Sequence, residues 1–247
     1  MQNRFWEIDF FRGLAIVMIL VSNLVTDLSY FGIYDINIYS GFWWFFARVV
    51  VFIFILLVGV SLTLSYSRVK DEPTKEIHIK YLKRGMKILG WGMTITLVTW
   101  IFLKEDFILF GVLHLIGISI ILAHFILKQR FLNLLLGSLF ILIGISLQNM
   151  TFDFYWFVWL GLRPSGFHSI DYVPILPWFG VVLVGVFLGN IFYPEGRKRF
   201  RIPYIHNHLT KLLCFLGRNS LLIYLTHQPV LVITLWLLFP FPQGFPL

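Results

Sequence analysis

Seven long runs of apolar residues follow one another along the chain. They cover about Asp9–Phe31, Gly41–Tyr66, Arg84–Leu103, Phe107–Leu127, Phe131–Leu147, Pro174–Phe192 and Leu212–Leu238. A helix needs about 20 apolar residues to cross the hydrocarbon core of a bilayer, whereas the strands of a membrane β-barrel alternate between apolar and polar. The pattern therefore predicts an all-α, polytopic transmembrane helix bundle with about seven spans.

One further apolar segment, Phe154–Leu162, has only nine residues, which is too few to cross a bilayer. We predict that it forms a short interfacial or re-entrant piece before the sixth span. Because the loops are short, residues 1–247 are expected to form a single membrane-embedded domain.

The composition excludes several classes of protein. Hydrophobic residues make up 58% of the chain and charged residues 13%, whereas a soluble domain is about 25% charged. A typical soluble enzyme, a disordered chain and a coiled coil are therefore excluded. The single cysteine, Cys214, cannot form a disulfide within the chain.

The net charge of +8 comes from cations in short loops, which is the pattern of membrane orientation and not of a nucleic-acid-binding face. Of the 20 Lys and Arg residues, 14 fall in loops on one predicted side and two, Lys104 and Arg163, on the other. Cytoplasmic loops are enriched in Lys and Arg. We therefore predict a multi-pass protein of the cell membrane, with its N-terminus in the cytoplasm and its C-terminus outside.

Polar residues form a stripe along the first span. At 100° per residue, Asn23 lies about 20° from Arg12 around the helix, and Asp9 and Asp27 each lie about 60° from Arg12 on the same side. An ionisable group at the bilayer centre costs about 2.5–3.5 kcal/mol on insertion scales, so such groups face the bundle interior. The alternative is a simple ion pair of Asp9 and Arg12 at the interface, which leaves Asn23 and Asp27 unexplained.

The polar residues fall into two layers by their predicted depth. Cations dominate the inner layer, which holds Arg12, Lys87 and Arg218. Histidine and acidic or amide side chains dominate the outer layer: Asn23, Asp27, Arg48, His114 and His227, with His168 and Asp171 in an outer loop. A cationic inner mouth suits a ligand with phosphates, and an outer layer of His and Asp suits proton transfer. The alternative for each buried histidine is a structural hydrogen bond between helices.

Four stretches of the chain carry a family resemblance. They are Arg4–Ile16, which contains Asp9-Phe10-Phe11-Arg12-Gly13, Phe110–Gly117, Asp171–Gly180, and Gly217–Ser220 together with Tyr224–Pro229. They resemble the heparan-alpha-glucosaminide N-acetyltransferase-like family of integral membrane acyltransferases, in its prokaryotic members. The resemblance spans nearly the whole chain.

The resemblance implies transfer of an acyl group, expected to be acetyl, from cytosolic acyl-CoA to a glycan, glycolipid-like or other polar acceptor at the outer face. Acyl-CoA would be a co-substrate, and no metal ion is expected because the sequence has no His/Cys cluster with metal-ligand spacing. The lipid bilayer is the expected surrounding, nucleic acid is not a partner, and a homodimer is left open.

One position departs from the family pattern. The wider acyltransferase superfamily often has a histidine eleven residues after the arginine that matches Arg12, and here that residue is Asn23. No histidine occurs between Asp27 and Phe42 either. The acid/base group would therefore have to be His114 or His227.

These observations assign candidate roles. His114 or His227 would act as the base, with Asp27 orienting the acceptor or the histidine and Asn23 donating to the oxyanion. Arg12, Arg218 and Arg48 would bind acyl-CoA. His168 and Asp171 would contact the acceptor. Two other functions stay open, a proton-coupled transporter that uses the same polar stripe as a relay and a non-catalytic membrane scaffold.

Overall fold

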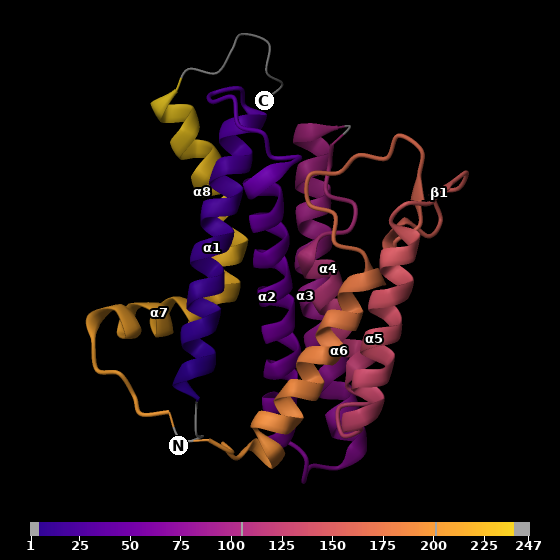
Figure 1. Ribbon diagram of the computed structural model, residues 1–247, viewed down its shortest axis with the longest axis vertical. Coiled ribbons are helices and arrows are strands. Elements are labelled where there is room, and N and C mark those ends of the chain that lie inside the picture. Colours follow the sequence, from indigo (N-terminus) through magenta and orange to yellow (C-terminus); the bar gives the residue numbers. More distant parts are fainter. Residues whose placement is uncertain (1–4, 105, 201, 240–247) are drawn as a thin grey trace. The chain divides into compact units, whose positions relative to one another are not determined.

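The computed structural model describes residues 5–104, 106–200 and 202–239. Arg4 and Arg201, two of the 14 cations on the predicted cytoplasmic side, lie outside these residues. Most of the described chain is helical, with almost no strand, and six helices are long and apolar enough to cross a membrane. The predicted all-α membrane bundle is therefore confirmed (Figure 1).

The six long helices are α1 (Trp6–Tyr30), α2 (Gly41–Ser67), α3 (Thr74–Leu103), α5 (Arg130–Leu147), α6 (Ile175–Phe192) and α8 (Ser220–Leu238). Two shorter helices are α4 (Val112–Ala123) and α7 (His208–Arg218). By clustering of contacts the chain forms two compact units. Of the described residues, unit 1 comprises 5–57 and 202–239, and unit 2 comprises 58–104 and 106–200.

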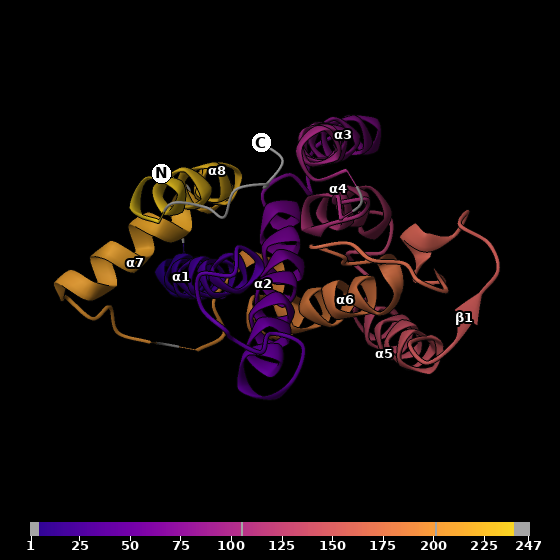
Figure 2. The same cartoon turned by 90° about the horizontal axis from the view of Figure 1, so that it is seen from above.

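Unit 1 is built on the packing of α1 against α7 and α8. Figure 1 shows α7 lying across the lower part of α1, and Figure 2, which looks along α1, shows α7 lengthwise. The crossing is close because both helices present glycine. A Cβ atom at Gly13 would overlap the backbone of Leu213, and one at Gly217 would overlap the backbone of Asp9. Small residues allow such backbone approach in membrane bundles.

Unit 2 contains α3–α6 and the second part of α2. Its closest pairs are α5 with α6 and α3 with α4. The α5–α6 pair also meets through glycine, since a Cβ atom at Gly137 would lie 2.9 Å from the carbonyl oxygen of Gly180. The contacts therefore use small residues in both units, as expected where lipid supplies no hydrophobic drive for helix association.

The fourth apolar run, Phe107–Leu127, was predicted to cross the membrane as one helix. Only the 12 residues of α4 within it are α-helical. Its two ends nevertheless reach distant points of α3. Thr96 donates to the carbonyl of Ile108 (2.6 Å), and the rings of His78 and His124 meet at 2.7 Å. Residues 78 and 96 are about 27 Å apart along a helix. The segment therefore runs beside nearly a full membrane thickness of α3.

The seventh run was predicted as one span, Leu212–Leu238, and this is wrong. The chain leaves helical geometry at Asn219, which ends α7 and precedes α8. The Asn219 side chain donates to the carbonyl of Phe215 (2.9 Å), which also accepts from the Asn219 backbone N–H (3.2 Å). Arg218 is consequently the last residue of α7, and not a residue in the inner half of a span.

The nine-residue segment Phe154–Leu162 lies in the connection between α5 and α6. This connection holds a short 3-10 helix, η1 (Val158–Leu160), and two residues each of β1 (Thr151–Phe152) and β2 (Arg163–Pro164), which pair in parallel. It is not a crossing, which agrees with its length.

Candidate functional site

Two side-chain contacts connect α1 to α8 in unit 1. The first joins Asn23 Nδ2 to His227 Nε2 at 2.7 Å. The other ring nitrogen of His227, Nδ1, lies 2.6 Å from the carbonyl oxygen of Tyr224. Because a carbonyl oxygen only accepts, Nδ1 must carry a hydrogen, and Nε2 of the neutral ring accepts the hydrogen bond from Asn23. The imidazole is thus held in one tautomer and one orientation.

The second contact lies beside the first. Gln228 Nε2 donates to Asp27 Oδ1 at 2.8 Å. Asp27 is 6% exposed, and its other oxygen, Oδ2, has no hydrogen-bond partner among the residues that the structure describes. A buried polar atom left without a partner is costly. Asp27 Oδ2 is therefore suited to accept a hydrogen bond from a bound molecule.

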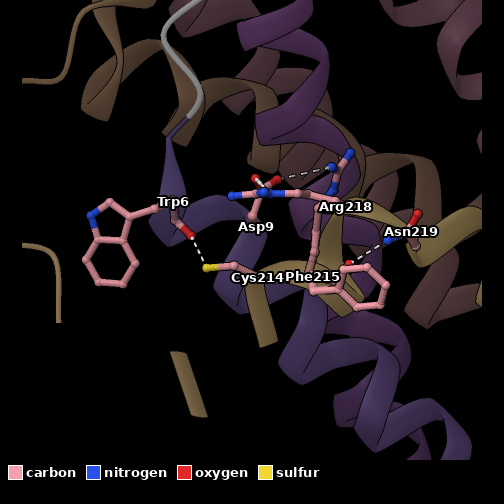
Figure 3. A network of polar contacts seen from close by, with 7 residues as sticks. Trp6, Asp9, Cys214, Phe215, Arg218 and Asn219 are labelled. Atoms are coloured by element: carbon pink, nitrogen blue, oxygen red, sulfur yellow. Dashed lines mark hydrogen bonds and ion pairs between the residues drawn. The ribbon is translucent and has the colours of Figure 1, made fainter. Parts of the chain in front are cut away.

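A group of charged side chains lies near the start of α1 (Figure 3). Asp9 Oδ2 lies 3.3 Å from Arg218 Nε, and Asp9 Oδ1 lies 3.9 Å from an Arg12 nitrogen. The Asp9 side chain is only 11% exposed, whereas Arg12 and Arg218 are 31% and 51% exposed. One carboxylate thus contacts two guanidinium groups, and these three side chains together carry a charge of +1. The buried carboxylate of Glu7 lies in the same first turn of α1. Such paired guanidinium groups are well suited to phosphate.

α1 contributes residues to both the cationic group and the Asn23–His227 contact. Arg12 and Asn23 are eleven residues apart, which is about 16 Å along α1. Both Asn23 and Asp27 meet α8, and Asp9 meets Arg218 at the end of α7. The polar stripe of α1 therefore faces other helices of unit 1.

Arg48 is exposed on α2. Its guanidinium carbon lies 3.6 Å from the centre of the Trp44 ring, one turn earlier, and one of its nitrogens contacts the Trp44 carbonyl at 3.5 Å. The guanidinium group over the Trp44 ring forms a cation–π pair within α2. A role for Arg48 in acyl-CoA binding stays a prediction.

His114 lies in unit 2 and is buried. The backbone N–H of Gly111 donates to its Nδ1 (3.2 Å), so the hydrogen of the neutral ring is on Nε2, which contacts Thr96 Oγ1 (3.2 Å). Gly92 of α3 leaves room for the ring, because a Cβ atom there would lie 3.1 Å from it. Nδ1 therefore caps the first turn of α4, whose N-cap is Gly111, and Nε2 joins α4 to Thr96 of α3, as in the structural alternative considered above.

The predicted outer-loop residues also lie in unit 2. Asp171 Oδ2 accepts from the backbone N–H of Val112 at 3.4 Å, at the first turn of α4, where a carboxylate is favourable. Its neighbour Tyr172 donates to the carbonyl of Val158 (2.7 Å), and burial raises the pKa of Tyr172 to about 12 despite the nearby cation Arg163. His168 is exposed. Contact of His168 and Asp171 with an acceptor stays a prediction.

The structure thus places Asn23 and Asp27 of α1 beside His227 and Gln228 of α8. It also places Arg12 and Arg218 around the carboxylate of Asp9. The predicted convergence of His114 with His227 involves residues of different units and stays a prediction. Sequence analysis did not assign roles to Asp9 or Gln228. The sequence pointed to both residues, because Asp9 lies on the polar stripe of α1 and Gln228 directly follows His227 in the family stretch Tyr224–Pro229.

The described part of the chain has six helices long enough to cross a membrane, and polar side chains form hydrogen bonds between helices. These features define the class of multi-pass helical membrane proteins. Within that class, a sequence model of the family described as "Heparan-alpha-glucosaminide N-acetyltransferase, catalytic" matches residues 4–229, and the chain belongs to this family. The resemblance inferred from the motifs is therefore confirmed. Comparison with curated proteins and with solved structures gave no match.

Proposed function

We propose that this protein transfers an acyl group, acetyl in the simplest case, from cytosolic acyl-CoA to a hydroxyl or amine of a sugar-like acceptor on the opposite side of the cell membrane. Membership of an acetyltransferase family supports the reaction class. The observation that carries the proposal is the polar face of α1, with a cationic group at one end and the Asn23–His227 contact about 16 Å further along.

Arg12 and Arg218 bind phosphate groups of acyl-CoA in this proposal. Asp9 contacts both, so it holds the two guanidinium groups in position before the donor arrives. Positions fixed in advance reduce the entropy that binding costs. The thioester end of the donor then extends along α1 toward Asn23.

His227 is the proposed base. When acyl-CoA binds, the Asn23 amide moves its hydrogen bond from His227 Nε2 to the thioester carbonyl oxygen, and the freed nitrogen takes the proton of the acceptor. The acceptor oxygen or nitrogen bonds to the carbonyl carbon, and the C–S bond breaks. The CoA thiolate leaves with the proton that His227 returns. Asn23 stabilises the oxyanion of the tetrahedral intermediate. In other enzymes one such hydrogen-bond donor lowers the activation free energy by about 3–4 kcal/mol. Asp27 Oδ2 accepts a hydrogen bond from the acceptor.

The local contacts favour His227 over His114 for this role. Nδ1 of His114 accepts from the Gly111 N–H that caps its own helix, and Nε2 contacts the Thr96 hydroxyl of α3, which is itself fixed by the Ile108 carbonyl. In His227 only Nδ1 is fixed by the backbone, while Nε2 meets a side chain that can turn away.

The test is a transfer assay with the full-length protein in vesicles, with acetyl-CoA as donor and glucosamine as the probe acceptor. His227→Gln should lower the rate of CoA release by about 10²–10⁴-fold, the usual contribution of a general base. Thr226→Ala is the matched control, because Thr226 is the exposed neighbour of His227 on α8. Unchanged transfer by a folded His227→Gln protein would remove His227 from the mechanism.

A further inference from the structure

The helix α7 has a surface that the proposed transfer does not use. With eleven residues it is about 16 Å long, too short to cross the roughly 30 Å hydrocarbon core. One face of it, formed by Thr210, Leu213, Cys214 and Gly217, is buried. The buried contacts of Gly13 and Gly217 attach this face to the first turns of α1.

This attachment fixes the depth of α7. Gly13 is seven residues after Trp6, the first residue of α1, which is about 10 Å along the helix. α7 also leads directly into α8, which is long and apolar enough to cross a membrane. A helix tied to the ends of two spans at this depth lies at the boundary between headgroups and acyl chains.

The outward side of α7 matches that boundary. Leu209, Leu212 and Phe215 are 60%, 55% and 61% exposed, and their spacing of three residues places them within about 120° of the helix circumference. The exposed cation Lys211 lies about 100° around the helix from Leu212. An apolar strip flanked by a cation is the pattern of a helix that lies in a membrane interface.

The charge of this region selects the lipid. α7 itself carries two cations, Lys211 and Arg218, and no acidic residue, and no acidic residue occurs in the sequence after Glu195. Clustered cations beside a span attract anionic headgroups. We propose that α7 binds anionic phospholipid in the leaflet that holds the start of α1, with acyl chains covering Leu209, Leu212 and Phe215 and Lys211 contacting the phosphate.

The depth of α7 can be measured by fluorescence quenching in the full-length protein. In a Cys214→Ser background, which removes the only cysteine, Leu209→Cys, Leu212→Cys and the matched Lys211→Cys are each labelled with a thiol-reactive fluorophore. In vesicles of phosphatidylcholine and phosphatidylglycerol in equal amounts, nitroxide lipid should quench positions 209 and 212, and aqueous iodide should quench position 211. Iodide quenching of all three positions, or no quenching of 209 and 212 by lipid, overturns the proposal.

Headgroup selectivity is measured with the label at position 212. Brominated phosphatidylglycerol should quench at about fivefold lower mole fraction than brominated phosphatidylcholine, as expected from one cation at the surface. Lys211→Gln should reduce this preference, and Lys87→Gln, the same change in an exposed lysine of α3, should leave it unchanged. Equal quenching by the two lipids in the unchanged Lys211 protein contradicts the proposed phosphate contact.

Discussion

At the scale of single residues, the partner of each ring nitrogen distinguishes the two buried histidines. The Tyr224 carbonyl fixes the hydrogen of His227 on Nδ1 and leaves Nε2 to a side chain, whereas a backbone N–H fixes Nδ1 of His114 as the acceptor. The two rings therefore present opposite tautomers to their surroundings. This difference cannot be predicted from sequence, because it depends on which backbone group each ring meets after folding.

The cationic group gives a prediction at the same scale. Arg12→Ala should weaken acetyl-CoA binding, because the proposed phosphate contact and the pairing with Asp9 are both lost. Arg12→Lys should restore only part of the affinity, since an ammonium group cannot make the forked contact of a guanidinium. Titration of the purified protein with acetyl-CoA measures both variants.

Lys83→Ala serves as the control for Arg12, because Lys83 is an exposed cation on α3 to which no contact with acyl-CoA is assigned. Its acetyl-CoA affinity should equal that of the unchanged protein. If Arg12→Ala folds and binds acetyl-CoA with unchanged affinity, Arg12 only makes a structural ion pair with Asp9.

At the scale of helices, hydropathy predicted most boundaries within a few residues, as for α5 and α6. It missed two features that hydropathy does not encode. One is the break at Asn219, which separates α7 from α8 within one predicted span. The other is the first ten residues of α3, which are too polar to count as part of a span although they are helical. A helix that extends beyond the bilayer continues in water, so apolar runs underestimate its length.

Close approach of helices predicts a stability effect. Gly137→Leu should destabilise unit 2 by about 1–3 kcal/mol or more, because its side chain would enter the space taken by the Gly180 carbonyl, 2.9 Å from a Cβ at this site. Thermal unfolding of the purified protein measures the change. The control is Gly90→Leu on α3, where a Cβ atom meets nothing within 4 Å. Equal unfolding temperatures for the two variants would show that the α5–α6 contact tolerates a larger separation.

At the scale of the whole molecule, the charge distribution predicts orientation. Cations concentrate in two segments, residues 68–84 and 197–211, which should therefore lie on the cytoplasmic side. In a Cys214→Ser background, an impermeant thiol reagent should label Ser165→Cys in intact cells and should label Lys75→Cys only after the membrane is opened. Labelling of position 75 but not of position 165 in intact cells would reverse the orientation.

The family and the membrane fold were predictable from sequence, because both are encoded in local patterns of apolar residues and in short motifs. The candidate site was predictable in part. The helical phase of Arg12, Asn23 and Asp27 indicated one polar face on α1, but the partners of that face, His227, Gln228 and Arg218, depend on how α7 and α8 pack against it.

The most direct test of the proposed function is the heat stability of the purified full-length protein with and without acetyl-CoA. A ligand present at about 100 times its dissociation constant stabilises the folded state by about 2.7 kcal/mol. Acetyl-CoA should therefore raise the unfolding temperature, free acetate should not, and Arg12→Ala should need more acetyl-CoA for the same rise. An unfolding temperature that acetyl-CoA leaves unchanged at saturating concentration would contradict the account.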